Sequence, residues 1–169
     1  MYLSFYREAI EIFCCMDRWE GAAMLIREIE KSDLPELMEI YTYLHDSAIP
    51  AINNETEALW CKIMNDPNHH IVVGITDNRI ISTCVLMIIP NLTHNQRPYA
   101  LIENVITHPA YRNQGHATQI LEYVKSLAVD NGCYKIMLMT GSKKDTTLNF
   151  YEHAGYNRSD KTAFIQWLI

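Results

Sequence analysis

Residues 103–117 read ENVITHPAYRNQGHA, and this stretch decides the fold more than any other part of the 169-residue chain. Its pattern predicts the end of a strand over 99–107, then a turn, then a helix that begins at His116. Such a strand–loop–helix aims several backbone N–H groups at one point, at the positive end of a helix dipole. Gly115 lets the backbone approach a ligand closely, and the small Ala117 leaves that point open. The stretch therefore predicts an anion-binding loop suited to a pyrophosphate.

Two widespread phosphate-binding patterns are missing from this loop. It has no Gly-Lys-Ser/Thr, which separates it from the P-loop, and no Gly-x-Gly-x-x-Gly, which separates it from the dinucleotide fingerprint. On physical grounds alone, a helix start that needs only a tight turn fits equally well. A second motif is needed to decide between the two interpretations.

Composition limits the classes of protein that the chain can belong to. Hydrophobic residues make up 49% and charged residues 20%, so one globular domain with a core is expected and disorder is excluded. The net charge of −6 argues against nucleic acid as a partner. No apolar run reaches the roughly 20 residues of a membrane span, so no membrane partner is expected. The charged N-terminal residues are not those of a signal peptide.

The cysteines and histidines predict neither disulfides nor a metal site. Five cysteines without a Cys-x-x-Cys pair favour reduced thiols and a cytoplasmic protein. Cys84 and Cys133 lie in apolar runs and are expected in the core. The pair His69-His70 has no partner at metal-ligand spacing.

From Met24 onward the periodicity predicts the order β-α-α-β-β-β-α-β-α-β, a mixed sheet with helices on its faces, in the α/β class. Ser32 is the expected cap of the first of these helices. Residues 1–23 are expected to be an N-terminal extension or leader, with a short amphipathic helix over 3–20, ahead of one domain over 24–169. The predicted strands are 24–29, 70–76, 79–89, 99–107, 134–140 and 163–169, and the predicted helices are 33–45, 56–65, 116–131 and 146–154.

The negative charge is concentrated in one segment. Residues 30–66 hold eight acidic and two basic side chains, so this segment carries the whole net charge and the remainder is neutral. These acids are either the solvated faces of two helices or a surface that favours a cationic ligand.

Two motifs together resemble those of the GNAT superfamily of N-acetyltransferases. Arg112-x-x-Gly115-x-Ala117, between a strand and a helix, is similar to the family's acetyl-CoA pyrophosphate loop. The stretch NFYEHAGY over 149–156 resembles the end of a later family helix, in the same order and at a similar distance. The resemblance covers about residues 24–169 and implies the GNAT fold. It also implies transfer of an acetyl group from acetyl-CoA to a primary amine of a small molecule, by direct attack.

The resemblance also implies roles for individual residues. Tyr151 matches the tyrosine that protonates the departing thiolate, and an ordinary tyrosine holds its proton at neutral pH. Glu103 stands where many members place a carboxylate that acts as a base through water, and a structural role remains the alternative. The implied cofactor-binding residues are Val105 and Ile106 for the pantetheine arm and Arg112, Asn113, Gln114, Gly115, His116, Ala117 and Thr118 for the phosphates.

One position departs from the family pattern, and several questions stay open. Lys144 stands where many members carry an asparagine that contacts the pantetheine, which puts that contact in doubt.

The alternatives to the enzyme of the resemblance are a non-catalytic acyl-CoA-binding module, an enzyme acting on a protein or peptide amine, and a binder of another nucleotide. Many family members dimerise, which leaves a homodimer open. No residue selects the acceptor amine.

Overall fold

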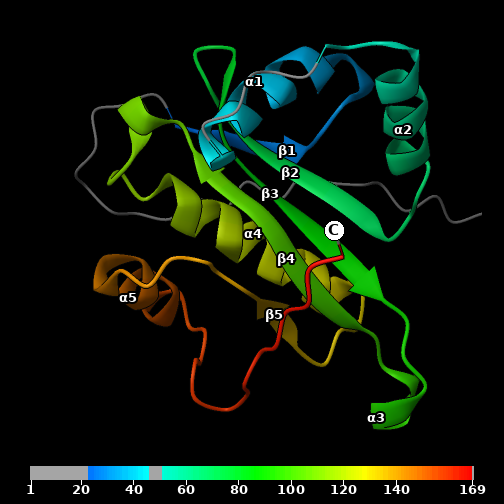
Figure 1. Cartoon of the computed structure of the whole chain (residues 1–169), viewed down its shortest axis with the longest axis vertical. Coiled ribbons are helices and arrows are strands. Elements are labelled where there is room, and N and C mark those ends of the chain that lie inside the picture. The colour runs from blue at the N-terminus through cyan, green and yellow to red at the C-terminus, as the bar shows by residue number, and fades with distance from the viewer. Residues whose placement is uncertain (1–22, 46–50, 169) are drawn as a thin grey trace, which may run out of the picture.

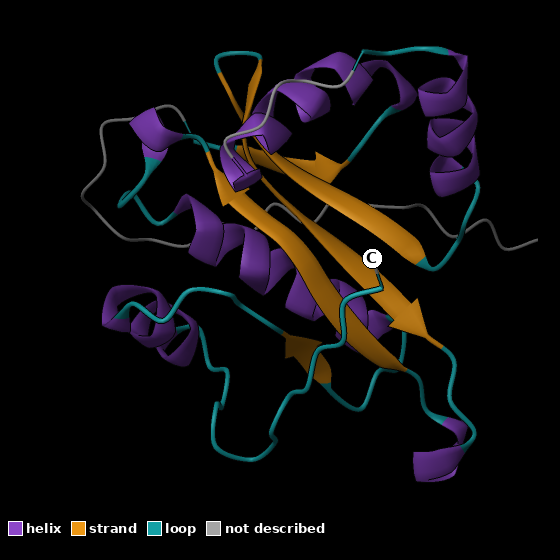
Figure 2. Cartoon of the chain, viewed as in Figure 1, coloured by secondary structure: helices purple, strands orange, loops and turns teal. Residues whose placement is uncertain are grey.

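The computed structural model describes residues 23–45 and 51–168, and these form a five-stranded sheet with helices on both faces (Figures 1 and 2). The strands lie side by side in chain order, the first four antiparallel and the last parallel to its neighbour. The predicted mixed sheet is confirmed. The strands are β1 (Leu25–Glu28), β2 (His69–Thr76), β3 (Arg79–Ile89), β4 (Tyr99–Thr107) and β5 (Ile136–Leu138).

The helices follow the predicted order with shifts of one or two residues at most ends. Residues 90–98, between β3 and β4, contain one short helix, and two 3-10 turns flank longer elements. The predicted helix over 3–20 lies outside the described residues. The helices are α1 (Leu34–His45), α2 (Asn54–Met64), α3 (Thr93–Gln96), α4 (His116–Asp130) and α5 (Asp145–His153), and the 3-10 turns are η1 (Lys31–Asp33) and η2 (Pro109–Tyr111).

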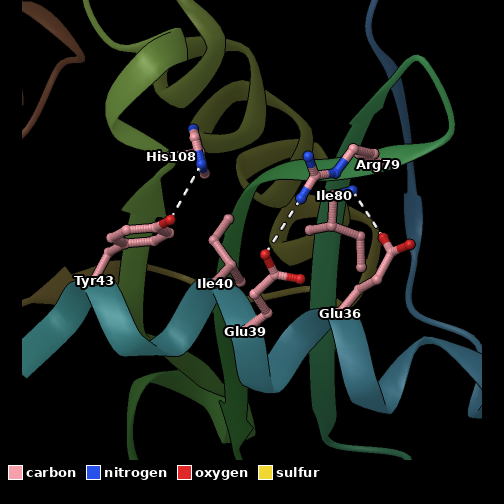
Figure 3. A pocket seen from close by; sticks show the side chains of 7 residues that line it. All are labelled: Glu36, Glu39, Ile40, Tyr43, Arg79, Ile80 and His108. Atoms are coloured by element: carbon pink, nitrogen blue, oxygen red, sulfur yellow. Dashed lines mark hydrogen bonds and ion pairs between the residues drawn. The ribbon is translucent and has the colours of Figure 1, made fainter. Parts of the chain in front are cut away.

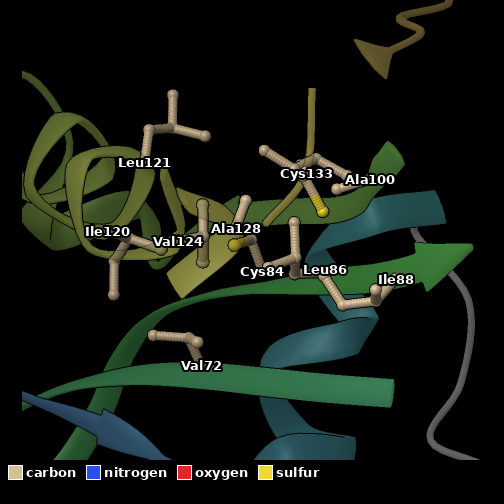
Figure 4. Packing of buried hydrophobic residues seen from close by; sticks show 11 residues of the cluster. Val72, Cys84, Leu86, Ile88, Ala100, Ile120, Leu121, Val124, Ala128 and Cys133 are labelled. Carbon is tan, nitrogen blue, oxygen red and sulfur yellow. The ribbon is translucent and has the colours of Figure 1, made fainter. Parts of the chain in front are cut away.

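The sheet separates two apolar clusters because neighbouring residues of a strand point to opposite faces. Val72 packs on the face covered by α4 and α5, here called the α4 face, in the cluster drawn in Figure 4. Ile71 and Val73 pack on the face covered by α1 and α2, here called the α1 face. Helix α4 places Ile120 and Val124, both fully buried, against the first cluster. Cys84 and Cys133 lie in the same cluster, which confirms both as core residues.

The cap predicted at Ser32 is wrong. A 3-10 turn over Lys31–Asp33 precedes α1, and its N-cap is Glu30. The side chain of Asp33 accepts a hydrogen bond from the backbone N–H of Glu30 at 2.7 Å, and it also binds the guanidinium of Arg27 on β1. A local capping box of Glu30 and Asp33, reinforced by the ion pair of Asp33 with Arg27, therefore sets the helix start two residues before the predicted cap.

The strand predicted over 163–169 is also wrong for the residues that the structure describes. Residues 161–168 are irregular, and all of them are exposed. Residue 169 lies outside the described range. The strand predicted over 134–140 is real, but only Ile136–Leu138 pair with β4.

Candidate active site

The loop between β4 and α4 presents the start of the helix without a capping side chain. Gly115 is the N-cap, in the left-handed region at φ 83°, and no side chain hydrogen-bonds to the first turn. A Cβ added at Gly115 would meet no atom within 4 Å, so the space in front of this turn is open. The first N–H groups of α4 are therefore available to an anion, as the sequence predicts.

Hydrogen bonds from its own side chains hold this loop in shape. The Nε of Arg112 donates to the carbonyl of Thr107 at 3.0 Å, and the Nε2 of Gln114 donates to the carbonyl of Ala110 at 3.2 Å. Asn113 is left-handed at φ 61°, which asparagine tolerates better than most residues. Arg112 is exposed, so its charge lies at the surface of the loop.

His116, the first residue of α4, has a partly desolvated ring. Its Nδ1 is buried and has no hydrogen-bond partner among the described residues, and its ring stands edge-on to Tyr111. Burial lowers the pKa of His116 below its ordinary value, so the imidazole is neutral at neutral pH. A neutral ring contributes a hydrogen-bonding group to the loop rather than a fixed positive charge.

Strand β4 has a free edge next to this loop. Its pairing with β5 covers Ala100–Ile102 and stops at the pair Ile102–Leu138. From Glu103 to Thr107 the strand has β3 on one side and no strand on the other, within the part of the chain that the structure describes. Backbone donors and acceptors along that edge are open to an extended ligand that ends at the anion loop.

A bulge interrupts β4 at the point where its edge becomes free. Val85 pairs with Glu103 and Thr83 with Ile106, so two residues of β4 stand opposite one residue of β3. Asn104 is left-handed at φ 53°. The extra residue reverses which side chains of β4 point to which face. Val105 packs on the α4 face and Ile106 on the α1 face, whereas in an uninterrupted strand Ile106 would share the α4 face with Ile102.

Tyr151 on α5 lies on the α4 face. It is half-buried, packs against the apolar cluster and stands edge-on to Tyr156, with ring centroids 6.2 Å apart. Burial, with a smaller contribution from nearby Cys84, raises the pKa of the Tyr151 phenol above its ordinary value. The phenol therefore keeps its proton at neutral pH, as a proton donor must.

Glu103 lies on the other side of the sheet from Tyr151. Its β3 partner Val85 belongs to the α1 face, and Glu103 itself is half-buried. Its carboxylate makes no hydrogen bond or ion pair with any residue in the described part of the chain. A group that crosses the free edge of β4 would thus have Tyr151 on one side and Glu103 on the other.

Sequence reasoning missed two residues at this place, Asn104 and Tyr41. The phenol of Tyr41, on α1, is half-buried and lies close to the side chain of Asn104. Burial outweighs that contact and raises the pKa of Tyr41 to about 12. A bulge leaves no reliable mark in a single sequence, although an asparagine before Val105 is compatible with the left-handed conformation.

A small polar pocket also lies under α1, and Figure 3 shows that its own side chains occupy it. Glu39 forms an ion pair with Arg79 at 3.2 Å, and the hydroxyl of Tyr43 lies 3.2 Å from the Nε2 of His108. The Nδ1 of His108 accepts a hydrogen bond from the N–H of Ala110. These side-chain contacts therefore connect α1 to the ends of the strands and to the anion loop.

The match to a family model decides the classification. Residues 35–156 match the model described as the acetyltransferase (GNAT) family, and this range includes both the free edge and the anion loop. The chain belongs to the GNAT acetyltransferase family. It is an N-acetyltransferase that uses acetyl-CoA as the acetyl donor.

Individual relatives agree with this assignment. A glucosamine 6-phosphate N-acetyltransferase of Trypanosoma brucei brucei is 27% identical over 140 residues, which cover 80% of this chain and 90% of the relative. A putative acetyltransferase structure from Agrobacterium tumefaciens is 32% identical, covers 85% of this chain and 99% of that one, and superposes with a TM-score of 0.79. An Arabidopsis thaliana glucosamine-6-phosphate N-acetyltransferase structure, 22% identical, covers 86% of this chain and 98% of its own, with a TM-score of 0.74, and shows the same fold.

The residues of this GNAT chain fit coenzyme A. The uncapped turn at Gly115 suits the phosphates, and the free edge from Glu103 to Thr107 suits an arm with amide groups. The described residues contain no cluster of His, Cys, Asp or Glu that could hold a metal ion. Their helices include none that is long and apolar enough to cross a membrane.

Proposed function

We propose that the acceptor of this acetyltransferase is a small amino sugar of the glucosamine 6-phosphate class. One observation carries the proposal: the likeness to the trypanosomal enzyme extends over 80% of this chain, so it is not confined to the family's cofactor loop. Acceptor choice in such an enzyme depends on surfaces beyond that loop, including α1 and α2 on the α1 face.

The chain's own residues would hold the cofactor from two elements. Gly115, His116, Ala117 and Thr118 offer the first-turn N–H groups of α4 to the phosphates, while Arg112, Asn113 and Gln114 shape the loop ahead of them. The backbone of Val105 and Ile106 on the free edge would pair with the amide groups of the pantetheine arm. Lys144, the N-cap of α5, donates no described side-chain hydrogen bond, so this arm depends on the β4 edge.

Two side chains would move protons during the transfer. Bound acetyl-CoA supplies an activated acetyl group on sulfur. Tyr151, whose pKa is raised by burial, donates its proton to the sulfur that leaves. Glu103, half-buried and without a described partner, accepts a proton from the acceptor amine directly or through water. Their positions on opposite faces of β4 support a division of labour between acid and base.

The acidic segment contributes less free charge to the α1 face than its sequence suggests. Asp33 is paired with Arg27, Glu39 is paired with Arg79, and a Glu36 oxygen accepts the N–H of Ile80. These three acids are used to attach α1, so the attraction of α1 for a polycation is weakened. The charge of α1 therefore does not by itself select a polyamine as the acceptor.

A panel of acceptors tests the proposal. CoA release should be measured with glucosamine 6-phosphate, glucosamine, an aminoglycoside, a polyamine and a peptide with a free N-terminus. The highest kcat/KM is expected for glucosamine 6-phosphate. A higher value for any other amine overturns the acceptor, and acetyl-CoA binding without turnover on any amine would make the chain a non-catalytic acyl-CoA module.

The free thiols of the described cysteines also support a cytoplasmic location. Cys61, Cys84 and Cys133 are all free, and burial raises the pKa of Cys84 to about 12, so its thiol is inert. Free thiols are usual in a reducing compartment. We therefore place the enzyme in the cytoplasm, and localisation of a tagged full-length chain tests this.

A further inference from the structure

His108, the residue directly after β4, uses both nitrogens of its ring. Its Nδ1 accepts a hydrogen bond from the backbone N–H of Ala110 at 3.2 Å, and its Nε2 lies 3.2 Å from the hydroxyl of Tyr43 on α1. Figure 3 shows the ring and that hydroxyl facing each other. One imidazole therefore contacts both the turn that leads into the anion loop and the helix that covers the α1 face.

These two contacts assign the hydrogen of the neutral ring. A backbone N–H can only donate, so the Nδ1 that receives it carries no hydrogen. The hydrogen is therefore on Nε2, which donates it to the hydroxyl oxygen of Tyr43. The nearby carboxylates are engaged elsewhere, since Glu39 is paired with Arg79 and a Glu36 oxygen accepts a backbone N–H of β3. A hydrogen on Nδ1 would remove the bond that holds the turn.

Capping of the turn explains only one of the two contacts. His108 is the N-cap of η2, a position where Ser, Thr, Asn and Asp are the usual residues. Their side chains receive such an N–H but are too short to reach α1 as well. The backbone of His108 is held separately, because its N–H donates to the carbonyl of Ile81 at 2.8 Å and its carbonyl accepts the N–H of Tyr111 at 2.9 Å. The turn does not need Nε2, so the contact with α1 has another role.

Packed rings continue from His108 to the first residue of α4. The His108 ring stands edge-on to Tyr43, with centroids 5.0 Å apart, and edge-on to Tyr111 at 5.6 Å. Tyr111 in turn stands 6.3 Å from His116, the residue after Gly115. These separations are those of interacting aromatic pairs. Helix α1 and the first turn of α4 are therefore connected by packed rings as well as by hydrogen bonds.

We propose that His108 is a positioning residue for acetyl-CoA, because its Nε2–H and the hydroxyl of Tyr43 fix the anion loop relative to α1. The inference rests on the cofactor role proposed above for that loop. Through this contact the position of α1 sets where the first N–H groups of α4 point, and with it the affinity for the cofactor's phosphates. Coupling between sites is reciprocal, so bound acetyl-CoA favours the position of α1 in which Tyr43 meets His108.

Acetyl-CoA affinity, measured by calorimetry without an acceptor, tests this contact. Tyr43→Phe removes only the hydroxyl, and His108→Asn keeps an acceptor for the turn but loses the contact with α1. Each is expected to weaken binding roughly fivefold, the effect of one lost hydrogen bond. The double variant is expected to bind no more weakly than either single variant, because both changes remove the same contact. Additive losses, or single variants that bind as wild type does, overturn the proposal.

Tyr123→Phe is the matched control for Tyr43→Phe. Tyr123 lies on α4 and is as exposed as Tyr43, at 37%. This variant is expected to bind acetyl-CoA as wild type does, and an equal loss in both overturns the proposal. All variants should keep the circular dichroism of wild type. A wrong acceptor leaves these affinities untouched, whereas unchanged binding in Gly115→Asp removes the loop from cofactor binding and the inference with it.

The tautomer of His108 provides a spectroscopic test. Nitrogen-15 spectra of the imidazole distinguish a nitrogen that carries hydrogen from one that does not. The neutral ring is expected to hold its hydrogen on Nε2, and the Nε2 signal is expected to move in Tyr43→Phe but not in Tyr123→Phe. Hydrogen on Nδ1, or an Nε2 signal that ignores the loss of the Tyr43 hydroxyl, overturns the proposal.

Discussion

Helices α4 and α1 cover opposite faces of the same sheet, and they are attached to it by different contacts. Helix α4 packs through buried aliphatic side chains such as Ile120 and Val124, which carry no polar atoms. Helix α1 also buries Leu37 and Ile40, but polar contacts surround them, among them the hydrogen bond that the backbone N–H of Ile80 donates to Glu36. The hydrophobic effect is non-directional, whereas charge-assisted hydrogen bonds require a particular geometry.

The comparison extends to the site. On the α4 side, the proposed cofactor-binding elements are backbone groups at Gly115 and along β4, with Tyr151 as the proposed proton donor. On the α1 side, side chains from distant elements act in pairs, as Tyr43 does with His108. The following substitutions separate the contributions of the two sides.

The largest effect is expected for Tyr151→Phe. Loss of a proton donor typically costs roughly 10²–10⁴-fold in rate, so kcat should fall by at least about 100-fold. Acetyl-CoA affinity, measured by calorimetry, should change little. Tyr156→Phe is the control, because it removes a hydroxyl from an adjacent half-buried tyrosine and should leave kcat near wild type. Unchanged turnover in Tyr151→Phe would remove this residue from the mechanism.

Gly115→Asp tests the backbone anion site. The substitution places a carboxylate and a strained left-handed residue where phosphates would bind. The loss of charge-assisted hydrogen bonds of about 1.5–3 kcal/mol corresponds to a KM for acetyl-CoA raised roughly 10–100-fold. Gly132→Asp has a similar backbone strain, at φ 73°, beyond the other end of α4. If both variants raise KM equally, strain rather than charge is responsible.

Asp33→Asn tests the attachment of α1. The hydrogen bond from Arg27 lowers the pKa of Asp33, so its ionised form stabilises the fold above about pH 4, the ordinary value of an aspartate, and that stability is lost as pH falls through the lowered pKa. Urea unfolding at neutral pH should show a loss of about 2 kcal/mol, shrinking in acid.

The control for Asp33→Asn is an exposed ion pair. Glu122 and Lys125 form one on the surface of α4, with both side chains more than half exposed. Glu122→Gln should cost less than about 0.5 kcal/mol. Equal losses in the two variants would mean that the Arg27–Asp33 pair has no special role in holding α1.

The smallest effect is expected for Tyr41→Phe, which asks whether the α1 side acts on the reaction through the bulge. Loss of a half-buried polar contact worth about 1 kcal/mol should lower kcat roughly fivefold, with the KM for acetyl-CoA unchanged. Tyr123→Phe, on the outer surface of α4, is the control. A rise in KM without a fall in kcat would place Tyr41 in cofactor binding instead.

The sequence predicts best the elements whose signals are local. The bounds of β4 and β3 match the prediction, and α4 begins at His116 as expected, because strand periodicity and a glycine before a helix are short-range patterns. The anion loop can be predicted from the sequence for the same reason.

The remaining features depend on partners that are far away in the sequence. The bulge at Asn104 depends on the register with β3, which periodicity does not encode. The last predicted strand shows the limit most clearly. Its composition is typical of a strand, but composition carries no information about whether a neighbouring strand is there to pair with it.

The bulge in β4 also restricts how this strand can change in evolution. Because Asn104 is an extra residue, even-numbered side chains point to one face of the sheet before it and to the opposite face after it. Deleting one residue there would exchange the faces of Val105 and Ile106 and turn the following loop away from α4. The number of residues between the two ends of β4 can therefore change only in steps of two. The spacing in sequence between this strand and the anion loop is thus constrained together with the residues of the candidate site.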